Sequence, residues 1–240
     1  LCDRQRAPDP RERDRLLILI VKNGSTHPRV KKAFGDYEGW FQSVLEGDPR
    51  RFRTVSPFLG EALPPLEGLD GILLTGSPAS VRDETPWMRE VAGFLREAAE
   101  REIPLLGVCF GHQILGEAFG GRVEKSPGGW EFGTVPIHLT EEGASDPLFS
   151  GLPRTFLAHA VHQDELSRPP PGAIRLAGNE RSRWQALALG PRIRAVQFHL
   201  ETSLPIMEAI ARAIGREAEF SPTDAGQRIL RNWERYFVRA

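Results

Sequence analysis

The sequence predicts an α/β protein with a mostly parallel central sheet, helices on both faces of that sheet, and an added antiparallel β region. Short apolar runs that end at Gly or Pro are typical of parallel strands buried on both faces. Stretches with apolar residues at spacings of three and four lie between and after these runs, as expected for helices packed on a sheet. Shorter β-like segments broken by Gly, Pro and charged turns occupy the second half of the chain, which indicates antiparallel strands.

The predicted parallel part occupies the first half of the chain. Residues 16–24 read LLILIVKNG, an apolar run that closes on an Asn-Gly turn, so we predict an interior strand there. Two similar runs, 69–78 and 103–111, are predicted to be strands as well. Helices are expected over 84–101, where apolar residues recur every three or four positions, and over 112–121, where two glycines stop the pattern.

The second half is predicted to be antiparallel β structure that ends in two helices. The expected strands have the sequences EFGTVPIHLT, TFLAHAVHQDEL, AIRLAG, WQALALG and IRAVQFHLE. Helices are predicted over 204–215 and 223–239. No repeat, low-complexity tract or linker interrupts the pattern. Residues 14–240 are therefore expected to form a single domain, preceded by a disordered tail over residues 1–13.

Composition and charge limit the partners of the protein. The 240 residues are 40% apolar and 26% charged, as in globular proteins, and 31 basic against 32 acidic residues leave a net charge of -1. This balance gives no electrostatic reason to expect a nucleic acid or an acidic membrane as partner. The apolar run Leu16–Val21 is far shorter than the roughly 18 to 20 residues of a membrane span, and residues 1–15 lack the apolar core of a secretory signal. With only Cys2 and Cys109 as cysteines, we expect no disulfide and a cytoplasmic protein.

The segment Leu105–Gln113 carries the strongest signal of chemistry. It reads LLGVCFGHQ, a buried strand that ends in Gly-x-Cys-x-Gly and turns directly into a helix. This is the thiol form of the nucleophile elbow, in which glycines leave room at a sharp turn and the start of the helix favours a thiolate. Cys109 is therefore the candidate nucleophile. The alternative is a buried, inert cysteine at a strand end.

A nucleophilic thiol needs a base, and among the six histidines His199 fits best. In the predicted strand 193–201, a period of two places His199 and Glu201 on the same side, where the carboxylate can fix the imidazole. The turn Thr75–Pro78, after another predicted strand, can aim a backbone N–H at an oxyanion, with the N–H of Phe110 as a second donor. These segments are expected to meet at the carboxyl edge of the parallel sheet.

Together, the segments Gly107–Gln113, Thr75–Pro78 and Gln197–Glu201 resemble the motifs of the class I, triad-type glutamine amidotransferases. The resemblance covers roughly residues 16–215 and extends to GMP synthase amidotransferase domains and stand-alone γ-glutamyl peptidases. It implies a triad in which the nucleophile is Cys109, the base and acid is His199, and the orienting carboxylate is Glu201.

The resemblance also implies which groups contact the substrate. The oxyanion hole would consist of N–H groups at Gly76, Ser77 and Phe110. The γ-glutamyl part would be held by Gln113, by His162 and by the backbone around Gln163. The chain departs from the family pattern in three places: Leu200 replaces a common proline, Ser77 replaces a common glycine, and Val161 and Gln163 replace small or polar residues.

A metal site is the alternative reading of the histidine-rich segments. His159, His162 and Asp164 could join His199 and Glu201 as ligands of zinc or iron. The triad explains His199 and Glu201 without a metal, and strand periodicity puts His159 and His162 on opposite faces. The Gly-rich stretch from Ser126 onward lacks the Lys-Ser/Thr of a phosphate-binding loop. No metal and no other cofactor is therefore expected.

The leading functional hypothesis is a glutamine-dependent amidase that releases ammonia through a γ-glutamyl thioester on Cys109. Because the sequence contains no nucleotide-binding motif, a synthase that accepts the ammonia is expected to be a separate polypeptide. The alternatives are a γ-glutamyl peptidase with the same triad and a non-catalytic regulator on this fold. The expected ligand is L-glutamine or a γ-glutamyl compound.

Overall fold

The computed structural model of the protein describes residues 16–239, so the tail predicted over residues 1–13 lies outside the described part. Its strands are β1 (Ile18–Val21), β2 (Phe52–Val55), β3 (Gly71–Leu74), β4 (Leu105–Val108), β5 (Arg122–Lys125), β6 (Glu131–Leu139), β7 (Thr155–His162), β8 (Asp164–Arg168), β9 (Ile174–Gly178), β10 (Ala186–Leu189) and β11 (Ile193–Val196). Its α-helices are α2 (Pro28–Phe34), α3 (Tyr37–Leu45), α4 (Pro86–Glu100), α5 (Phe110–Ala118), α6 (Glu141–Ser145), α7 (Leu204–Ile214) and α8 (Ala225–Trp233). Short 3-10 turns are η1 (Pro49–Arg51), η2 (Pro57–Leu59), η3 (Val81–Asp83) and η4 (Pro147–Phe149), and η5 (Glu234–Val238) is a π-helical turn.

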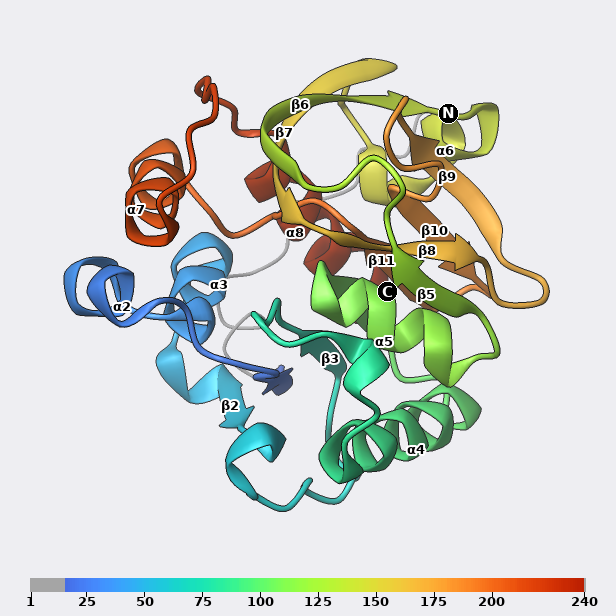
Figure 1. The fold of residues 1–240 in the computed structure, drawn as a ribbon. Coiled ribbons are helices and arrows are strands. Elements are labelled where there is room, and N and C mark those ends of the chain that lie inside the picture. The colour runs from blue at the N-terminus through green and yellow to red at the C-terminus, as the bar shows by residue number, and fades with distance from the viewer. Residues whose placement is uncertain (1–15, 240) are drawn as a thin grey trace.

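Nine strands form one mixed sheet in the order β2-β1-β3-β4-β11-β10-β9-β6-β7, and β5 pairs with β8 in a separate small sheet (Figure 1). Every neighbouring pair from β2 to β11 is parallel. Every neighbouring pair from β11 to β7 is antiparallel. The predicted fold class, a parallel core with added antiparallel strands, is confirmed.

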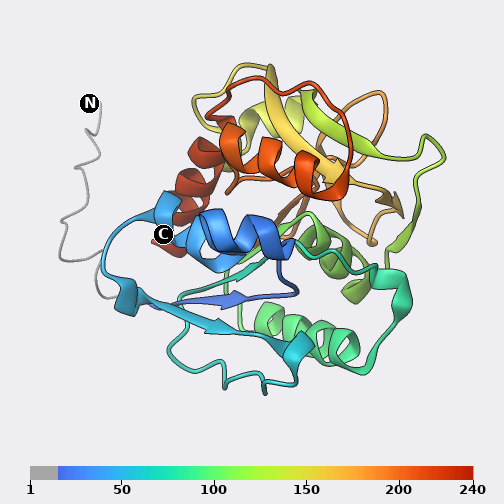
Figure 2. The ribbon, with the colours of Figure 1, turned by 60° about the vertical axis from the view of Figure 1, so that its left-hand side comes forward.

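The parallel strands are buried on both faces, as their continuous apolar sequences predict. In β1, Ile18 and Ile20 belong to one core cluster, whereas Leu19 and Val21 belong to another on the opposite face. The first cluster includes residues of α3 and α8, and the second includes residues of α4 and α5. Figure 2 shows α3 and α8 on one side of these strands and α4 on the other. The central sheet is therefore covered by helices on both faces.

The structure corrects the predicted course of three segments. Residues 193–201 were expected to be an antiparallel strand, but β11 ends at Val196 and is parallel to β4, being antiparallel only to β10. The strand expected over 155–166 is interrupted at Gln163, which separates β7 from β8. The helix expected over 223–239 begins at Ala225 and changes into the π-helical turn η5 after Trp233.

Several short elements had no clear sequence signal. Strands β2 and β5 have the sequences FRTV and RVEK, in which polar side chains are exposed, so neither forms an apolar run. Helices α2 and α3 are only 7 and 9 residues long and follow β1 closely. Within residues 16–239, no helix combines the length and the apolar character needed to cross a membrane.

Candidate active site

The candidate site lies where three neighbouring parallel strands end. Gly76 follows β3, Cys109 follows β4, and His199 comes three residues after β11. Because β3, β4 and β11 are adjacent in the sheet, their carboxyl ends bring these residues together from distant parts of the chain. The edge formed by carboxyl ends is where open α/β sheets place their ligands.

Cys109 occupies a sharp turn between β4 and α5. Its backbone angles are φ 54° and ψ -105°, in the positive-φ region that residues other than glycine seldom adopt. A Cβ on Gly107 would lie 2.6 Å from the Gly111 carbonyl carbon, and one on Gly111 would lie 2.5 Å from the Leu74 carbonyl oxygen. Only glycine fits at these two positions, which explains the Gly-x-Cys-x-Gly pattern.

The Cys109 thiol is buried, with 6% of the residue exposed, and its Sγ lies 3.8 Å from the Val161 carbonyl oxygen. Cys109 precedes the first residue of α5, so the positive end of the helix dipole is directed toward it. The Phe110 N–H donates no hydrogen bond to any residue between 16 and 239. A free N–H beside a thiol at a helix start suits an oxyanion that forms on a bound carbonyl.

His199 and Glu201 form a buried pair. The imidazole Nδ1 lies 2.8 Å from Glu201 Oε1, and the Leu200 N–H donates to Glu201 Oε2 at 2.9 Å. The pair forms beyond the end of β11, so strand periodicity is not what brings it together. Instead, an isolated antiparallel bridge to His159 fixes His199, whose N–H donates to the His159 carbonyl at 2.8 Å.

The other imidazole nitrogen of His199, Nε2, is buried and has no hydrogen-bond partner in the described chain. Burial lowers the pKa of His199, but the Glu201 carboxylate and the Cys109 thiol outweigh it and raise that pKa well above 6.5. The site therefore favours a protonated imidazole beside a thiolate, the ion pair that activates cysteine nucleophiles.

Gly76 lies between the cysteine and the histidine. A Cβ at this position would be 3.3 Å from His199 Cε1, 3.6 Å from Tyr37 Cε1 and 3.8 Å from Cys109 Cβ. Among residues 16–239, neither the Gly76 N–H nor the Ser77 N–H has a backbone or side-chain acceptor. The turn after β3 thus brings two unpaired donors to the edge of the sheet that carries Cys109.

The residues expected to hold the substrate are mostly engaged with the protein itself. Gln113 donates through Nε2 to the Asp164 carbonyl at 2.9 Å and to Gln197 Oε1 at 3.1 Å. Gln163 accepts a hydrogen bond from the Ser126 N–H through its carbonyl at 2.8 Å. His162 uses both ring nitrogens: Nε2 lies 2.7 Å from Glu131 Oε2, and Nδ1 lies 3.1 Å from the Asp164 carbonyl.

Two residues at the site had no predicted role. Tyr37, at the start of α3, is buried, and this burial together with the nearby Cys109 and Glu201 raises the pKa of its hydroxyl far above 10.0. Burial and the neighbouring His199 lower the pKa of His159 to about 4, which keeps its ring neutral at physiological pH. No sequence signal identified Tyr37, because α3 itself was not predicted. His159 was considered only as a metal ligand.

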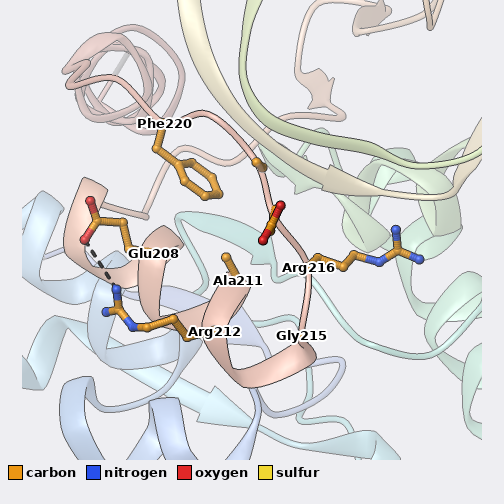
Figure 3. Close-up of a pocket in the computed structure, with 8 residues that line it drawn as sticks. Glu208, Ala211, Arg212, Gly215, Arg216 and Phe220 are labelled. Carbon is orange, nitrogen blue, oxygen red and sulfur yellow. Dashed lines mark ion pairs between the residues drawn. The ribbon is translucent and has the colours of Figure 1, made fainter.

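Neither a metal cluster nor the pocket near α7 belongs to this site in the part of the chain that the structure describes. Residues 16–239 contain no group of three or more His, Cys, Asp or Glu side chains placed to hold a metal ion. Figure 3 shows a pocket of about 630 Å³ formed by the end of α7 and the segment after it, with Phe220 on one wall. Glu208 and Arg212, 3.7 Å apart, form an ion pair at its rim. None of the residues around Cys109 lines this pocket.

The fold and the residues at this edge define an α/β protein with a cysteine elbow and a histidine–glutamate pair on adjacent strands. The sequence profile described as "Glutamine amidotransferase class-I" matches residues 53–210, and the chain belongs to that family.

Known proteins resemble the chain over most of its length. A subunit of the glutamine-hydrolyzing GMP synthase of Methanopyrus kandleri is 28% identical over 191 residues, which cover 77% of this chain and 89% of that protein. Gamma-glutamyl peptidase 5 of Arabidopsis thaliana is 26% identical over 208 residues, covering 85% and 82% of the two chains. The crystal structure of a glutamine amido transferase from Methylobacillus flagellatus shares the fold, with a TM-score of 0.72 at 19% identity over 92% of this chain and 95% of that one.

Proposed function

We propose that the protein hydrolyses the side-chain amide of L-glutamine through a triad of Cys109, His199 and Glu201. The observation that carries the proposal is the free Nε2 of His199: its ring is fixed by Glu201 through Nδ1, which leaves the other nitrogen available on the side of Cys109. Membership of the class I glutamine amidotransferase family supports the same reaction.

In the proposed reaction, the Cys109 thiolate attacks the amide carbonyl carbon and forms a C–S bond. The oxyanion accepts hydrogen bonds from the N–H groups of Phe110 and of Gly76 or Ser77. As the C–N bond breaks, His199 Nε2 gives its proton to the departing ammonia. His199 then takes a proton from water, which attacks the thioester, and glutamate leaves as Cys109 is regenerated. Glu201 holds the ring and stabilises its protonated form throughout.

The purified chain should therefore release ammonia and glutamate from glutamine in equal amounts. Brief treatment with a glutamine-mimicking electrophile, followed by mass mapping, should place the adduct on Cys109. Modification confined to Cys2, with hydrolysis intact, would contradict the proposed nucleophile.

We also propose that the ammonia is used by a separate polypeptide. The M. kandleri relative is named as one subunit of its synthase, and this chain covers 89% of it. By contrast, the chain covers only 33% of the glutamine-hydrolyzing GMP synthase of Thermosipho melanesiensis, to which it is 38% identical over 190 residues. A protein of this kind should hydrolyse glutamine slowly alone and faster when its acceptor partner is added, because the partner aligns the site.

A γ-glutamyl peptidase is the second candidate, favoured by the 26% identity to the Arabidopsis peptidase over 82% of that protein. The same triad would cleave a γ-glutamyl peptide bond, with an amino acid or peptide as the leaving group. Kinetics of the isolated chain on glutamine and on γ-glutamyl dipeptides separate the two candidates. Fast dipeptide cleavage with poor glutamine turnover would favour the peptidase and exclude a partner-dependent subunit.

A further inference from the structure

Asn23 lies two residues after β1, against the turn that carries Gly76. The residue is 1% exposed. Its backbone N–H donates to Thr75 Oγ1 at 3.0 Å, and its side-chain Nδ2 donates to the Thr75 carbonyl at 2.9 Å. One step earlier, the Thr75 N–H donates to the Val21 carbonyl at 3.1 Å. The side-chain amide of Asn23 therefore continues the hydrogen bonding between β1 and β3 beyond the point where both strands end.

The bond to the Thr75 carbonyl fixes the direction of the next N–H. No peptide bond between residues 16 and 239 is cis, so in the Thr75–Gly76 peptide the C=O and the N–H point in opposite directions. The C=O points to Asn23, on the side of β1. Because β1 and β4 flank β3 on opposite sides, the Gly76 N–H is turned toward the side of β4, where Cys109 lies.

Gly24 supports the same turn by direct contact. A Cβ at Gly24 would lie 2.5 Å from Ser77 Oγ and 2.9 Å from Pro78 Cδ, so the backbone after Asn23 approaches the turn as closely as a glycine allows. Residues 23 and 24 thus hold the turn at two points, one a hydrogen bond and the other a packing contact.

We propose that Asn23 is a positioning residue of the oxyanion hole, which aims the Gly76 N–H at the substrate oxyanion by binding the Thr75 carbonyl. The inference rests on the proposed function, and it concerns a residue outside the range 53–210 matched by the family profile. Asn23 acts through the Thr75–Gly76 peptide and does not touch the substrate. A donor misplaced by about 1 Å costs on the order of 100-fold in rate, and a lost oxyanion donor costs about 100- to 1000-fold.

The test compares Asn23→Ala with Asn232→Ala in the full chain. Asn232, on α8, is a matched control because its side-chain amide also donates to backbone carbonyls, those of Leu148 at 3.0 Å and Ser150 at 2.9 Å. Glutamine hydrolysis gives kcat and KM. Alkylation of Cys109 by iodoacetamide reports on the thiolate alone, because that substitution forms no oxyanion.

We expect Asn23→Ala to lower kcat by about 30- to 300-fold, with KM and the alkylation rate changed by less than about threefold. Asn232→Ala should leave kcat and alkylation at wild-type values. Hydrolysis by Asn23→Ala as fast as by Asn232→Ala would overturn the inference. Equal losses of hydrolysis and alkylation would also overturn it, because they would indicate general disruption of the site.

If Asn23→Ala does not fold, Asn23→Asp replaces it, since aspartate keeps the volume and the backbone N–H but lacks the side-chain donor at neutral pH. The same separation of hydrolysis from alkylation is expected. Failure of the proposed function looks different: wild-type protein would then hydrolyse neither glutamine nor γ-glutamyl dipeptides, and the inference would fall with it.

Discussion

Two buried histidines in this protein each bind a glutamate, and they do so with different consequences. His199 lies 2.8 Å from Glu201 through Nδ1 and keeps Nε2 without a partner in the described chain. His162 lies 2.7 Å from Glu131 through Nε2, and its Nδ1 is bonded to the Asp164 carbonyl. The first pair has one nitrogen available for proton transfer, whereas the second has none.

The carboxylates differ in the same way. Glu131 is the centre of a polar network, because it also accepts hydrogen bonds from Asn179 Nδ2 at 2.6 Å and Gln185 Nε2 at 2.5 Å. These residues come from several strands and loops of the antiparallel half. The comparison teaches that burial and a carboxylate partner do not identify a base. An unpaired nitrogen beside a nucleophile is the distinguishing feature.

The largest expected effect separates the two histidines by activity. His199→Ala and Cys109→Ser should each lower kcat by about 10⁴-fold or more, because each removes a group that takes part in the proposed bond changes. His162→Ala should lower kcat by less than about 100-fold. It should instead destabilise the fold by about 3 kcal/mol, since buried Glu131 loses a partner.

Steady-state hydrolysis and urea unfolding of these variants measure both effects. Similar losses of kcat in folded His199→Ala and His162→Ala would remove the distinction between a base and a structural histidine.

A smaller effect is expected for Glu201→Gln. The carboxylate orients and stabilises the His199 ring but neither attacks nor transfers the proton, so the loss of kcat should be at least about tenfold smaller than for Cys109→Ser or His199→Ala. Glutamine hydrolysis by the three variants, with folding checked by circular dichroism, establishes the order. A loss with Glu201→Gln equal to that with Cys109→Ser would require a different role for Glu201.

The smallest expected effects are opposite responses of stability to pH. The pKa of His199 is lowered by burial but raised more by Glu201 and Cys109, to well above 6.5. Its protonated form therefore stabilises the fold fully below about pH 6.5, and this contribution is lost as pH rises through the raised pKa. The pKa of Glu131 is raised by burial but lowered more by His162 and its other donors, to below 4.5. Ionised Glu131 therefore stabilises the fold above about pH 4.5, and this is lost as pH falls through the lowered pKa.

Urea unfolding of Glu201→Gln and Glu131→Gln between about pH 4 and pH 9 checks this difference. Relative to wild type, Glu201→Gln should lose most stability at the acidic end, and Glu131→Gln at the neutral and alkaline end. The changes should be on the order of 1 kcal/mol, the size of a pKa shift of about one unit. Parallel pH profiles for the two variants would show that the pairs do not differ in this way.

The candidate site was predictable where chemistry dictates local sequence. The elbow needs glycines at 107 and 111 because backbone atoms of Gly111 and Leu74 leave no room for a Cβ, and this requirement is written in consecutive residues. The His199–Glu201 pair was predicted for the wrong reason, since the residues lie beyond β11 and the bridge to His159 fixes the histidine.

The remaining features depend on contacts that no local pattern records. The direction of β11 relative to β4 and β10 is set by which strands it joins, and its apolar sequence is compatible with either direction. Asn23 and Tyr37 approach the site only because β1 lies beside β3 and α3 packs near Gly76. Glu131 and His162 are 31 positions apart, and their pairing follows from the register of β6 with β7.

The position of β11 has a consequence for the order of events during synthesis. The strand sits in the middle of the sheet, between β4 and β10, although it is the last strand of the described chain. Until it is inserted, the edge of β4 is unpaired and Cys109 has neither histidine nor glutamate beside it. A growing polypeptide therefore carries the thiol long before it carries the means to activate it. The insertion that closes the sheet and joins its two halves is also the one that completes the triad.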